Sequence, residues 1–117
     1  MVLTCFLSTA INGITEEQQK DIFEFVDITI RNEYELQRED IVVIESNFPE
    51  PPAPCAIQHK KLHHLEMALN KMKNCDVFFL LQENDGSTKP GCLVEMMAWT
   101  TACSTVQPII RRKPKND

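Results

Sequence analysis

The sequence predicts an α/β fold, in which strands and helices alternate along a chain of 117 residues. Short apolar runs without polar alternation, typical of strands covered on both faces, recur between segments with helical apolar spacing. Strands joined through a helix pair in parallel by right-handed crossovers. The length allows one domain, residues 1–117. We therefore expect a three-layer α/β/α domain of the flavodoxin or Rossmann type, with a parallel sheet of four to five strands.

The first part of the chain predicts two strands with a helix between them. The apolar run Val2–Leu7 indicates a buried strand, and the small residues of Ser8–Gly13 indicate a loop. Thr15 and Gln18 have the spacing of a capping box, which predicts that a helix with a broad apolar stripe begins here. Ile41–Ile44 is rich in β-branched residues and predicts a second short strand.

The second part continues the alternation after a loop that contains four prolines, Asn47–Pro54. Helical spacing of apolar residues over Ile57–Asn74 predicts the second helix. Val77–Leu81 is apolar throughout and predicts a third buried strand. A third helix is expected over Gly91–Cys103 and a last strand over Val106–Ile110.

The charge balance excludes some classes of partner. Lys and Arg number 12 against 17 Asp and Glu, which gives a net charge of −5. This balance argues against binding of nucleic acid or of an anionic membrane surface as the main function. The basic residues near the C-terminus are expected to form a solvated terminus. They are Arg111, Arg112, Lys113 and Lys115.

The cysteines and the apolar segments indicate in which cellular compartment the protein is expected. Five cysteines form no CxxC pair, and several lie in apolar segments, where a free thiol behaves as a small apolar group. The first ten residues lack the basic region and the long apolar core of a signal peptide. No segment is long and apolar enough to span a membrane. We therefore expect a reduced, cytoplasmic protein that binds no membrane.

The most informative segment, Asp76–Cys103, contains a buried strand, a polar loop and a helix with Glu95 in its first turns. Open parallel sheets bind ligands at the carboxyl ends of their strands, against helix N-termini. Glu95 follows Pro90, which suits the first helical position, and Gly91, which lets a ligand approach closely. The helix N-terminus favours an ionised carboxylate, as a nucleophile requires. The same position also suits an acid that only stabilises the helix.

The segments LTCFLSTA, MKNCDVFFLL and PGCLVEMMAWTTA, followed by VQPII, resemble the nucleoside 2-deoxyribosyltransferase-like superfamily. The resemblance spans most of the chain. In this alignment Gly91 corresponds to a family glycine, Glu95 to the nucleophile and Asp76 to the acid before a buried strand. Lys89 stands about where family enzymes carry an aspartate, and Asp85 in the preceding loop could substitute for that acid.

The resemblance implies that Glu95 attacks the anomeric carbon of a deoxyribose and displaces the base. The resulting glycosyl–enzyme would be released by another base or by water, with Asp76 or Asp85 as the partner acid. It also implies a nucleoside or nucleotide substrate, no cofactor and a homo-oligomer. The residues expected to bind the substrate are Ser8, Thr9, Ala10, Ser87, Lys89 and Gly91.

Each of these polar residues also has a structural interpretation. Asp76 could mark the end of a helix and the start of a strand. Asp85 precedes a glycine, a common turn dipeptide, and Ser87 and Thr88 could cap the third helix. Two other functions therefore stay open. One is a non-catalytic nucleotide-binding or sensing protein, in which Lys89 favours a phosphate-bearing ligand; the other is an interaction protein with a vestigial cleft.

Two further groups favour structural roles. Cys55, His59 and His63 are spaced by four residues, as zinc ligands on a helix can be, but no HExxH pattern is present. With two lysines beside the histidines, a basic solvated face is the preferred interpretation, and no metal is expected. Trp99 has helical spacing to Met96 and predicts packing in the core or in a subunit interface.

Overall fold

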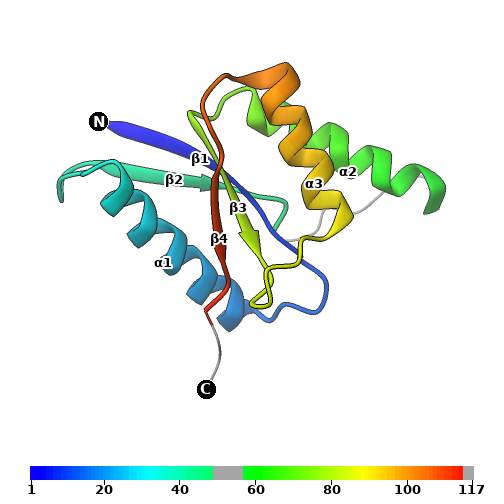
Figure 1. The fold of residues 1–117 in the computed structure, drawn as a ribbon, viewed down its shortest axis with the longest axis horizontal. Coiled ribbons are helices and arrows are strands. Elements are labelled where there is room, and N and C mark those ends of the chain that lie inside the picture. The colour runs from blue at the N-terminus through cyan, green and yellow to red at the C-terminus, as the bar shows by residue number, and fades with distance from the viewer. Residues whose placement is uncertain (49–56, 115–117) are drawn as a thin grey trace.

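Strands and helices alternate in the computed structural model, which describes residues 1–48 and 57–114. Figure 1 shows these elements in chain order. They are β1 (Val2–Ser8), α1 (Glu16–Glu33), β2 (Ile41–Glu45), α2 (Ile57–Met72), β3 (Val77–Gln82), α3 (Pro90–Ala98), the π-helical turn η1 (Trp99–Cys103) and β4 (Ile109–Arg112). The predicted third helix is thus found as α3, continued by η1.

Within the described residues, one sheet of four parallel strands has the order β2-β1-β3-β4. The parallel pairing of β1 sets Val2 opposite Ile41 on one side and Cys5 opposite Val77 on the other. The predicted α/β fold with a parallel sheet is therefore confirmed. The chain order reverses at β1, which pairs with β2 on one edge and β3 on the other. In such sheets, ligands bind beyond the carboxyl ends of the strands at this reversal.

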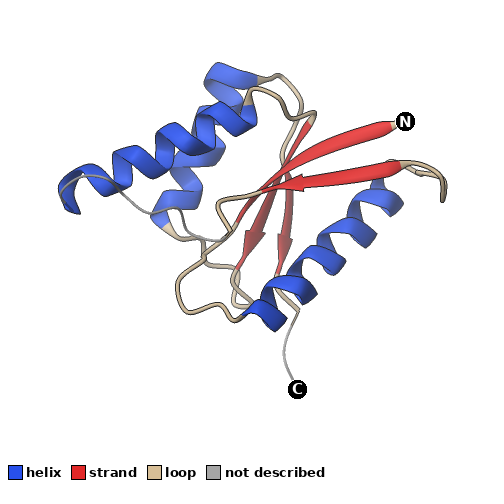
Figure 2. Ribbon diagram, turned by 180° about the vertical axis from the view of Figure 1, so that it is seen from behind, coloured by secondary structure: helices blue, strands red, loops and turns tan. Residues whose placement is uncertain are grey.

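Alternate residues of the central strands pack on opposite faces of the sheet. On one face Leu7 and Phe79 pack with buried side chains of α1, namely Ile22, Val26 and Ile30. On the other face Phe6 and Phe78 pack against α2, α3 and η1 through Ala68, Met72, Cys92 and Trp99. Figures 1 and 2 show α1 apart from the other two helices, with the sheet between them. The side-chain alternation thus decides which strand residues can meet α3.

The predicted start of α1 is confirmed in atomic detail. The Thr15 hydroxyl oxygen accepts a hydrogen bond from the Gln18 backbone N–H at 3.1 Å, and the Gln18 side-chain oxygen accepts one from the Thr15 N–H at 2.9 Å. This reciprocal pair is a capping box, which satisfies two backbone donors at the helix start. It fixes where the chain leaves the loop after β1.

The last strand begins at Ile109, three residues later than predicted. Val106 is held outside the sheet because its carbonyl accepts the Trp99 indole N–H at 2.8 Å and its N–H donates to the Ser104 hydroxyl at 3.1 Å. Pro108 has no backbone N–H to give to a neighbouring strand. The prediction of a strand over Val106–Ile110 was therefore wrong in its boundaries.

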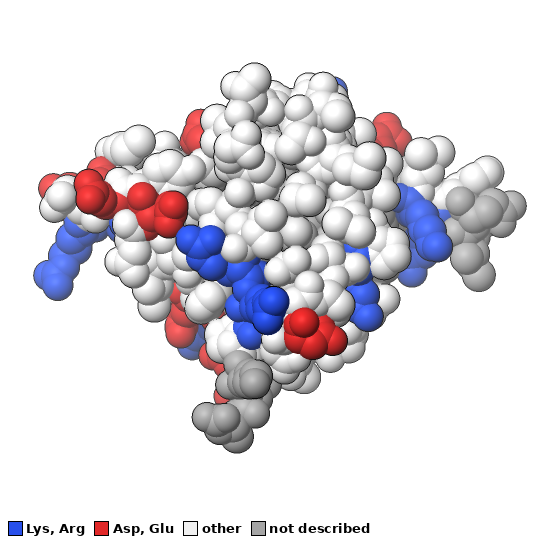
Figure 3. Space-filling view, viewed as in Figure 1, with Lys and Arg blue, Asp and Glu red and all other residues white. Residues whose placement is uncertain are grey.

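Two of the basic residues near the C-terminal end are part of the sheet, although their side chains are solvated as expected. Arg111 and Arg112 lie in β4, and the Lys113 N–H donates to the Gln82 carbonyl at 2.8 Å. The side chains of Arg111 and Arg112 are exposed, and Figure 3 shows basic side chains gathered beside a broad uncharged surface. Lys115 lies outside the described residues.

Among the helices of the described ranges, none has the length and apolarity needed to cross a membrane.

Candidate functional site

The carboxylate of Glu95, on α3, meets side chains from the ends of two neighbouring strands. The Ser8 hydroxyl donates to Glu95 Oε1 at 2.6 Å, and Asn47 Nδ2 donates to Glu95 Oε2 at 3.4 Å. Ser8 is the last residue of β1, and Asn47 follows β2 by two residues. Both carboxylate oxygens are thus oriented by hydrogen-bond donors at the carboxyl end of the sheet.

The strand register explains why Ser8 and Asn47 meet. Parallel pairing places Val2 opposite Ile41 and Phe6 opposite Glu45. The same offset, continued by two residues, places Ser8 beside Asn47. Alternation along β1 gives Ser8 the same face as Phe6, which packs against α2 and α3. Ser8 and Asn47 therefore lie on the face of the sheet that α3 covers, and Glu95 of α3 contacts both.

Burial and charge act on Glu95 in opposite directions. Burial raises the pKa of Glu95 above its ordinary value near 4.5, and the hydrogen bond from Ser8 and the positive charge of Lys71 partly offset this rise. Lys71 lies in the last turn of α2, and its ammonium group donates to the carbonyl oxygen of Ser46. Shifted pKa values cluster at functional sites, and a raised carboxyl pKa by itself suits a general acid or base.

Cys92, one helical turn before Glu95, is the nearest thiol to the carboxylate along α3. Burial raises the pKa of Cys92, and the nearby charge of Glu95 adds to the rise, whereas a hydrogen bond with Ser8 lowers it. The thiol is therefore kept protonated, and a protonated thiol is a poor nucleophile. Of these two groups, the Glu95 carboxylate is the one held by hydrogen bonds from the ends of two strands.

The structure does not bring Asp76 to Glu95. The Asp76 carboxylate accepts the Thr4 backbone N–H at 2.8 Å, and the Asp76 N–H donates to the Thr4 carbonyl at 2.7 Å. Thr4 lies in the first half of β1, and Asp76 directly precedes β3. Glu95 lies at the opposite edge of the sheet, where the strands end. Asp76 thus joins the start of β3 to β1, which is the structural interpretation of this residue.

Asp85 stabilises the turn between β3 and α3. Its carboxylate accepts the Ser87 N–H at 2.8 Å, and the Gly86 N–H donates to the Glu83 carbonyl at 2.9 Å. Hydrogen bonds from the Ser87 hydroxyl and N–H lower the pKa of Asp85. An exposed carboxylate held in its ionised form has no proton to give to a leaving group. The contacts of Asp85 are those of a turn residue.

The turn predicts a measurable cost for a side chain at Gly86. Gly86 has φ +86°, and an added Cβ would lie 2.8 Å from the Arg112 guanidinium. We expect Gly86→Ala to lower the free energy of unfolding by about 1–2 kcal/mol, because L-residues are strained in this conformation. Urea unfolding measures the change. Gly91→Ala is the control, since no atom outside its chain neighbours and its own helix backbone lies within 4 Å of its Cβ position. An equal stability for the two variants would contradict the prediction.

Part of the loop before α3 makes internal hydrogen bonds, whereas Ser87 of that loop is exposed. Thr88 accepts the Gln82 side-chain N–H at 3.0 Å, so its hydroxyl supports the loop. Lys89 occupies the N-cap position of α3, and among the described residues no side chain caps this helix. The expectation that Ser87 or Thr88 caps α3 was therefore wrong. Lys89 and Gly91 are exposed.

Two buried oxygens near the site lack a hydrogen-bond partner among the described residues. They are Thr9 Oγ1, directly after Ser8, and Asn47 Oδ1, on the amide that contacts Glu95. Buried polar atoms without a partner are rare and require an explanation. Ala10, also expected to bind the substrate, is half-buried.

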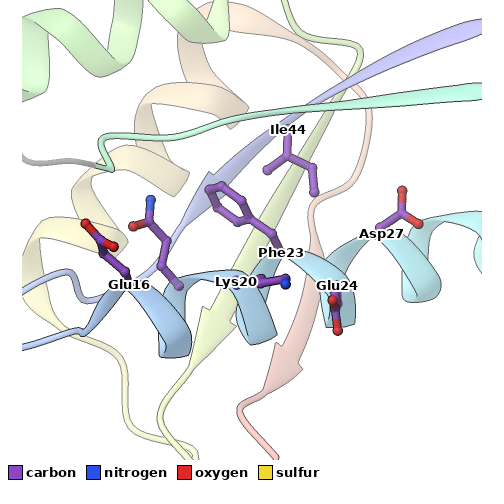
Figure 4. Close-up of a pocket in the computed structure, with 7 residues that line it drawn as sticks. Glu16, Lys20, Phe23, Glu24, Asp27 and Ile44 are labelled. Carbon is purple, nitrogen blue, oxygen red and sulfur yellow. The ribbon is translucent and has the colours of Figure 1, made fainter.

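A groove of about 520 Å³ lies elsewhere, between α1 and the edge strand β2. Figure 4 shows Phe23 and Ile44 between these elements, with the acidic residues Glu16 and Glu24 on α1. A second cavity of about 520 Å³ lies beside the start of α1 and includes Leu81 and Lys113. Glu95 lines neither cavity. The Asp27 carboxylate in the groove pairs with Arg31 of the same helix. Glu95 instead meets residues at or just after the ends of two different strands, so we place the candidate site at Glu95.

No group of three or more His, Cys, Asp or Glu side chains suited to a metal ion occurs in the ranges that the structure describes. His59 and His63 lie on α2, and Cys55 lies outside those ranges.

Asn47 and Lys71 were not predicted from the sequence as site residues. Asn47 was assigned only to the proline-rich loop, although a polar residue directly after a parallel strand is a signal for the ligand-binding edge. Lys71 gives no such signal, because a lysine on an amphipathic helix usually faces solvent.

Comparison of the chain with protein-family models, with curated proteins and with solved structures gave no match. The geometry around Glu95 is therefore the main ground for a function of this chain.

Proposed function

We propose that the protein cleaves or transfers the N-glycosidic bond of a nucleoside or nucleotide, with Glu95 as the nucleophile. The observation that carries the proposal is the pair of hydrogen bonds from Ser8 and Asn47, which orient both Glu95 oxygens at the carboxyl end of the sheet. A positioned carboxylate at this edge suits covalent glycosyl transfer. The resemblance of PGCLVE to the nucleophile segment of deoxyribosyltransferases supports the same role.

The reaction has two balanced steps. A Glu95 oxygen bonds to the anomeric carbon while the carbon–nitrogen bond breaks, and the electron pair leaves with the base, which takes a proton from water. A water molecule or a second base then attacks the same carbon, the ester bond to Glu95 breaks, and the attacking group gives its proton to the hydroxide left in solvent by the first step. Attack by water gives hydrolysis, whereas attack by a base gives transfer. Glu95 returns as a carboxylate in both cases.

The chain's own residues have distinct roles in this proposal. Ser8 and Asn47 position the carboxylate, and the charge of Lys71 favours the ionised form that attacks. Lys89 and Gly91, exposed at the start of α3, are the proposed contacts for a substrate phosphate. No cofactor is part of the proposal.

A non-catalytic nucleotide-binding protein is the second candidate function. It is favoured by one observation: the predicted partner acids, Asp76 and Asp85, make structural contacts and do not contact Glu95. In that protein, Lys89 and the N-terminus of α3 would hold a phosphate without turnover.

We further propose that the protein acts in the cytoplasm as a homo-oligomer. Residues 90–110 contain a single charged residue, Glu95, and Leu93, Val94 and Met97 are exposed on α3. Figure 3 shows a broad uncharged surface in the same region. Apolar patches of this kind are typical of protein interfaces. Sedimentation velocity measures the assembly, and a monomer at all concentrations would contradict it.

The decisive experiment measures release of free base. The protein is incubated with the four common nucleosides and their 5′-monophosphates, each in ribo and 2′-deoxy form, and products are separated by chromatography. We expect base release, and a loss of about a thousandfold or more in Glu95→Gln, because removal of a nucleophile has effects of this size. Asp85→Asn is the matched acidic control and should stay active. Unchanged activity in Glu95→Gln would exclude the nucleophile role.

A further inference from the structure

The two polar atoms of the Asn47 side-chain amide differ in their hydrogen bonding. Its Nδ2 donates to Glu95 Oε2 at 3.4 Å, and its Oδ1 is buried without a partner among the described residues. The assignment of the two amide atoms follows from the chemistry, because an ionised carboxylate only accepts hydrogen bonds. The amide nitrogen therefore faces Glu95, and the amide oxygen is left as an acceptor beside the nucleophile.

The position of Asn47 is fixed from two sides. The Lys71 ammonium group binds the carbonyl oxygen of Ser46, the preceding residue. The Ser46 hydroxyl accepts the N–H of Phe48, the following residue, at 3.2 Å. Ser46 itself is buried. A buried acceptor held in this way discriminates between ligands that do and do not supply a donor.

The chemistry of the proposed reaction limits what that donor can be. The anomeric carbon that Glu95 attacks is bonded to the ring oxygen, to the base nitrogen and to C2 of the sugar. The ring oxygen has no proton, and the base nitrogen carries none in the intact substrate. A hydroxyl group on C2 is therefore the donor closest to the reacting carbon, and hydrogen bonds to this hydroxyl strengthen in glycosyl-transfer transition states.

We infer that Asn47 is a specificity-determining residue whose Oδ1 accepts a hydrogen bond from the sugar 2-hydroxyl, so that the substrate is a ribosyl compound. This inference rests on the proposed function, and it departs from the deoxyribose that the resemblance implies. A 2-deoxyribosyl substrate leaves Asn47 Oδ1 without a partner, as it is in the free protein. The ribosyl substrate satisfies it.

The first test compares turnover of matched substrates. We expect wild-type kcat/KM to be at least tenfold higher for ribonucleoside 5′-monophosphates than for the 2′-deoxy compounds. Asn47→Ala should lower the value for the ribo substrates and bring the ratio close to one. Asn70→Ala is the matched control, because Asn70 is exposed on α2, and its ratio should equal that of the wild type. Base release with an equal or reversed wild-type ratio would overturn the inference and leave the proposed function standing.

The second test does not depend on turnover. Titrations with D-ribose 5-phosphate and 2-deoxy-D-ribose 5-phosphate, followed by NMR, give the two dissociation constants for the wild type and for Asn47→Ala. We expect at least tenfold tighter binding of the ribose compound, lost in Asn47→Ala, with circular dichroism showing that the variant is folded. Tighter binding of the ribose compound without any base release would support Asn47 as the residue that recognises the sugar 2-hydroxyl. It would also reject the proposed reaction. Equal binding of the two probes by the wild type would reject the Asn47 inference.

Discussion

Glu95→Gln should be more stable than the wild type at pH 8 and should lose this advantage at pH 4. Burial raises the pKa of Glu95 above its ordinary value near 4.5, so the folded protein holds the Glu95 proton more tightly than the unfolded chain does. The favourable contribution of protonated Glu95 is complete below pH 4.5. It is lost as the pH rises through the raised pKa, because the folded state must then hold a buried negative charge.

The glutamine side chain avoids that charge and fits the same partners. Its oxygen can accept the Ser8 hydroxyl, and its nitrogen can donate to Asn47 Oδ1 once the Asn47 amide turns over. That bond takes the place of the one from Asn47 Nδ2 to Glu95, and the turned amide brings Nδ2 to the position that Oδ1 holds in the wild type. We expect a gain of about 0.5–2 kcal/mol at pH 8, the size common for single stabilising substitutions.

Urea unfolding at pH 4 and at pH 8 measures this difference. Other acids, such as Asp40 and Asp85 with their lowered pKa values, destabilise both proteins alike as the pH falls, and their effect cancels in the difference. Glu66→Gln, at an exposed position on α2, is the control, and its difference should not depend on pH in this way. A Glu95→Gln difference of the same size at both pH values would show that burial does not control this carboxylate.

A substitution of Lys71 tests the same pKa of Glu95 in a second way. The Lys71 charge lowers the pKa of Glu95, so Lys71→Met should raise this pKa further. The loss of stability should then begin at a higher pH, and the advantage of Glu95→Gln at pH 8 should be larger in the Lys71→Met background. A double-mutant cycle gives the coupling between the two residues. A coupling of zero would mean that Lys71 acts only through its bond to Ser46.

The sequence predicts elements whose determinants are local. Thr15 and Gln18 form their capping box within a single turn, and β3 is apolar along its whole length, so no distant residue is needed to recognise either. The start of β4 depends on distant contacts. Val106 is kept out of the sheet by Trp99, seven residues earlier, through an indole bond that has no sequence signature.

The sequence predicted part of the candidate site, again the part with a local signal. Glu95 could be found because it lies in the helix that directly follows a buried strand, although the structure places it beyond the first turn of that helix. Asp76 precedes that strand, and the amino end of a parallel strand lies opposite the ligand-binding edge, so topology alone argues against a role beside Glu95. Asn47 meets Ser8 only through the register of β1 and β2, which the sequence does not state.

Trp99→Ala should cause the largest loss of stability, about 3–5 kcal/mol, the usual cost of removing a buried aromatic side chain. Trp99 is fully buried and packs on Phe78, with ring centroids 5.8 Å apart, and Phe78 in turn stacks on Phe6 at 5.7 Å. These three rings lie in the core between the sheet and the helices α2 and α3. Loss of the Trp99 ring leaves a cavity under the helix that carries Glu95.

Trp99→Phe separates the packing of the ring from its hydrogen bond. Phenylalanine keeps an aromatic ring but cannot donate to the Val106 carbonyl, so we expect a smaller loss of about 1–3 kcal/mol. Urea unfolding is followed by circular dichroism, because Trp99 is the only tryptophan and its fluorescence is absent from both variants. Equal losses in the two variants would assign the effect to the hydrogen bond that holds residue 106 outside β4. A much larger loss in Trp99→Ala would show that ring packing anchors α3, and with it Glu95, on the sheet.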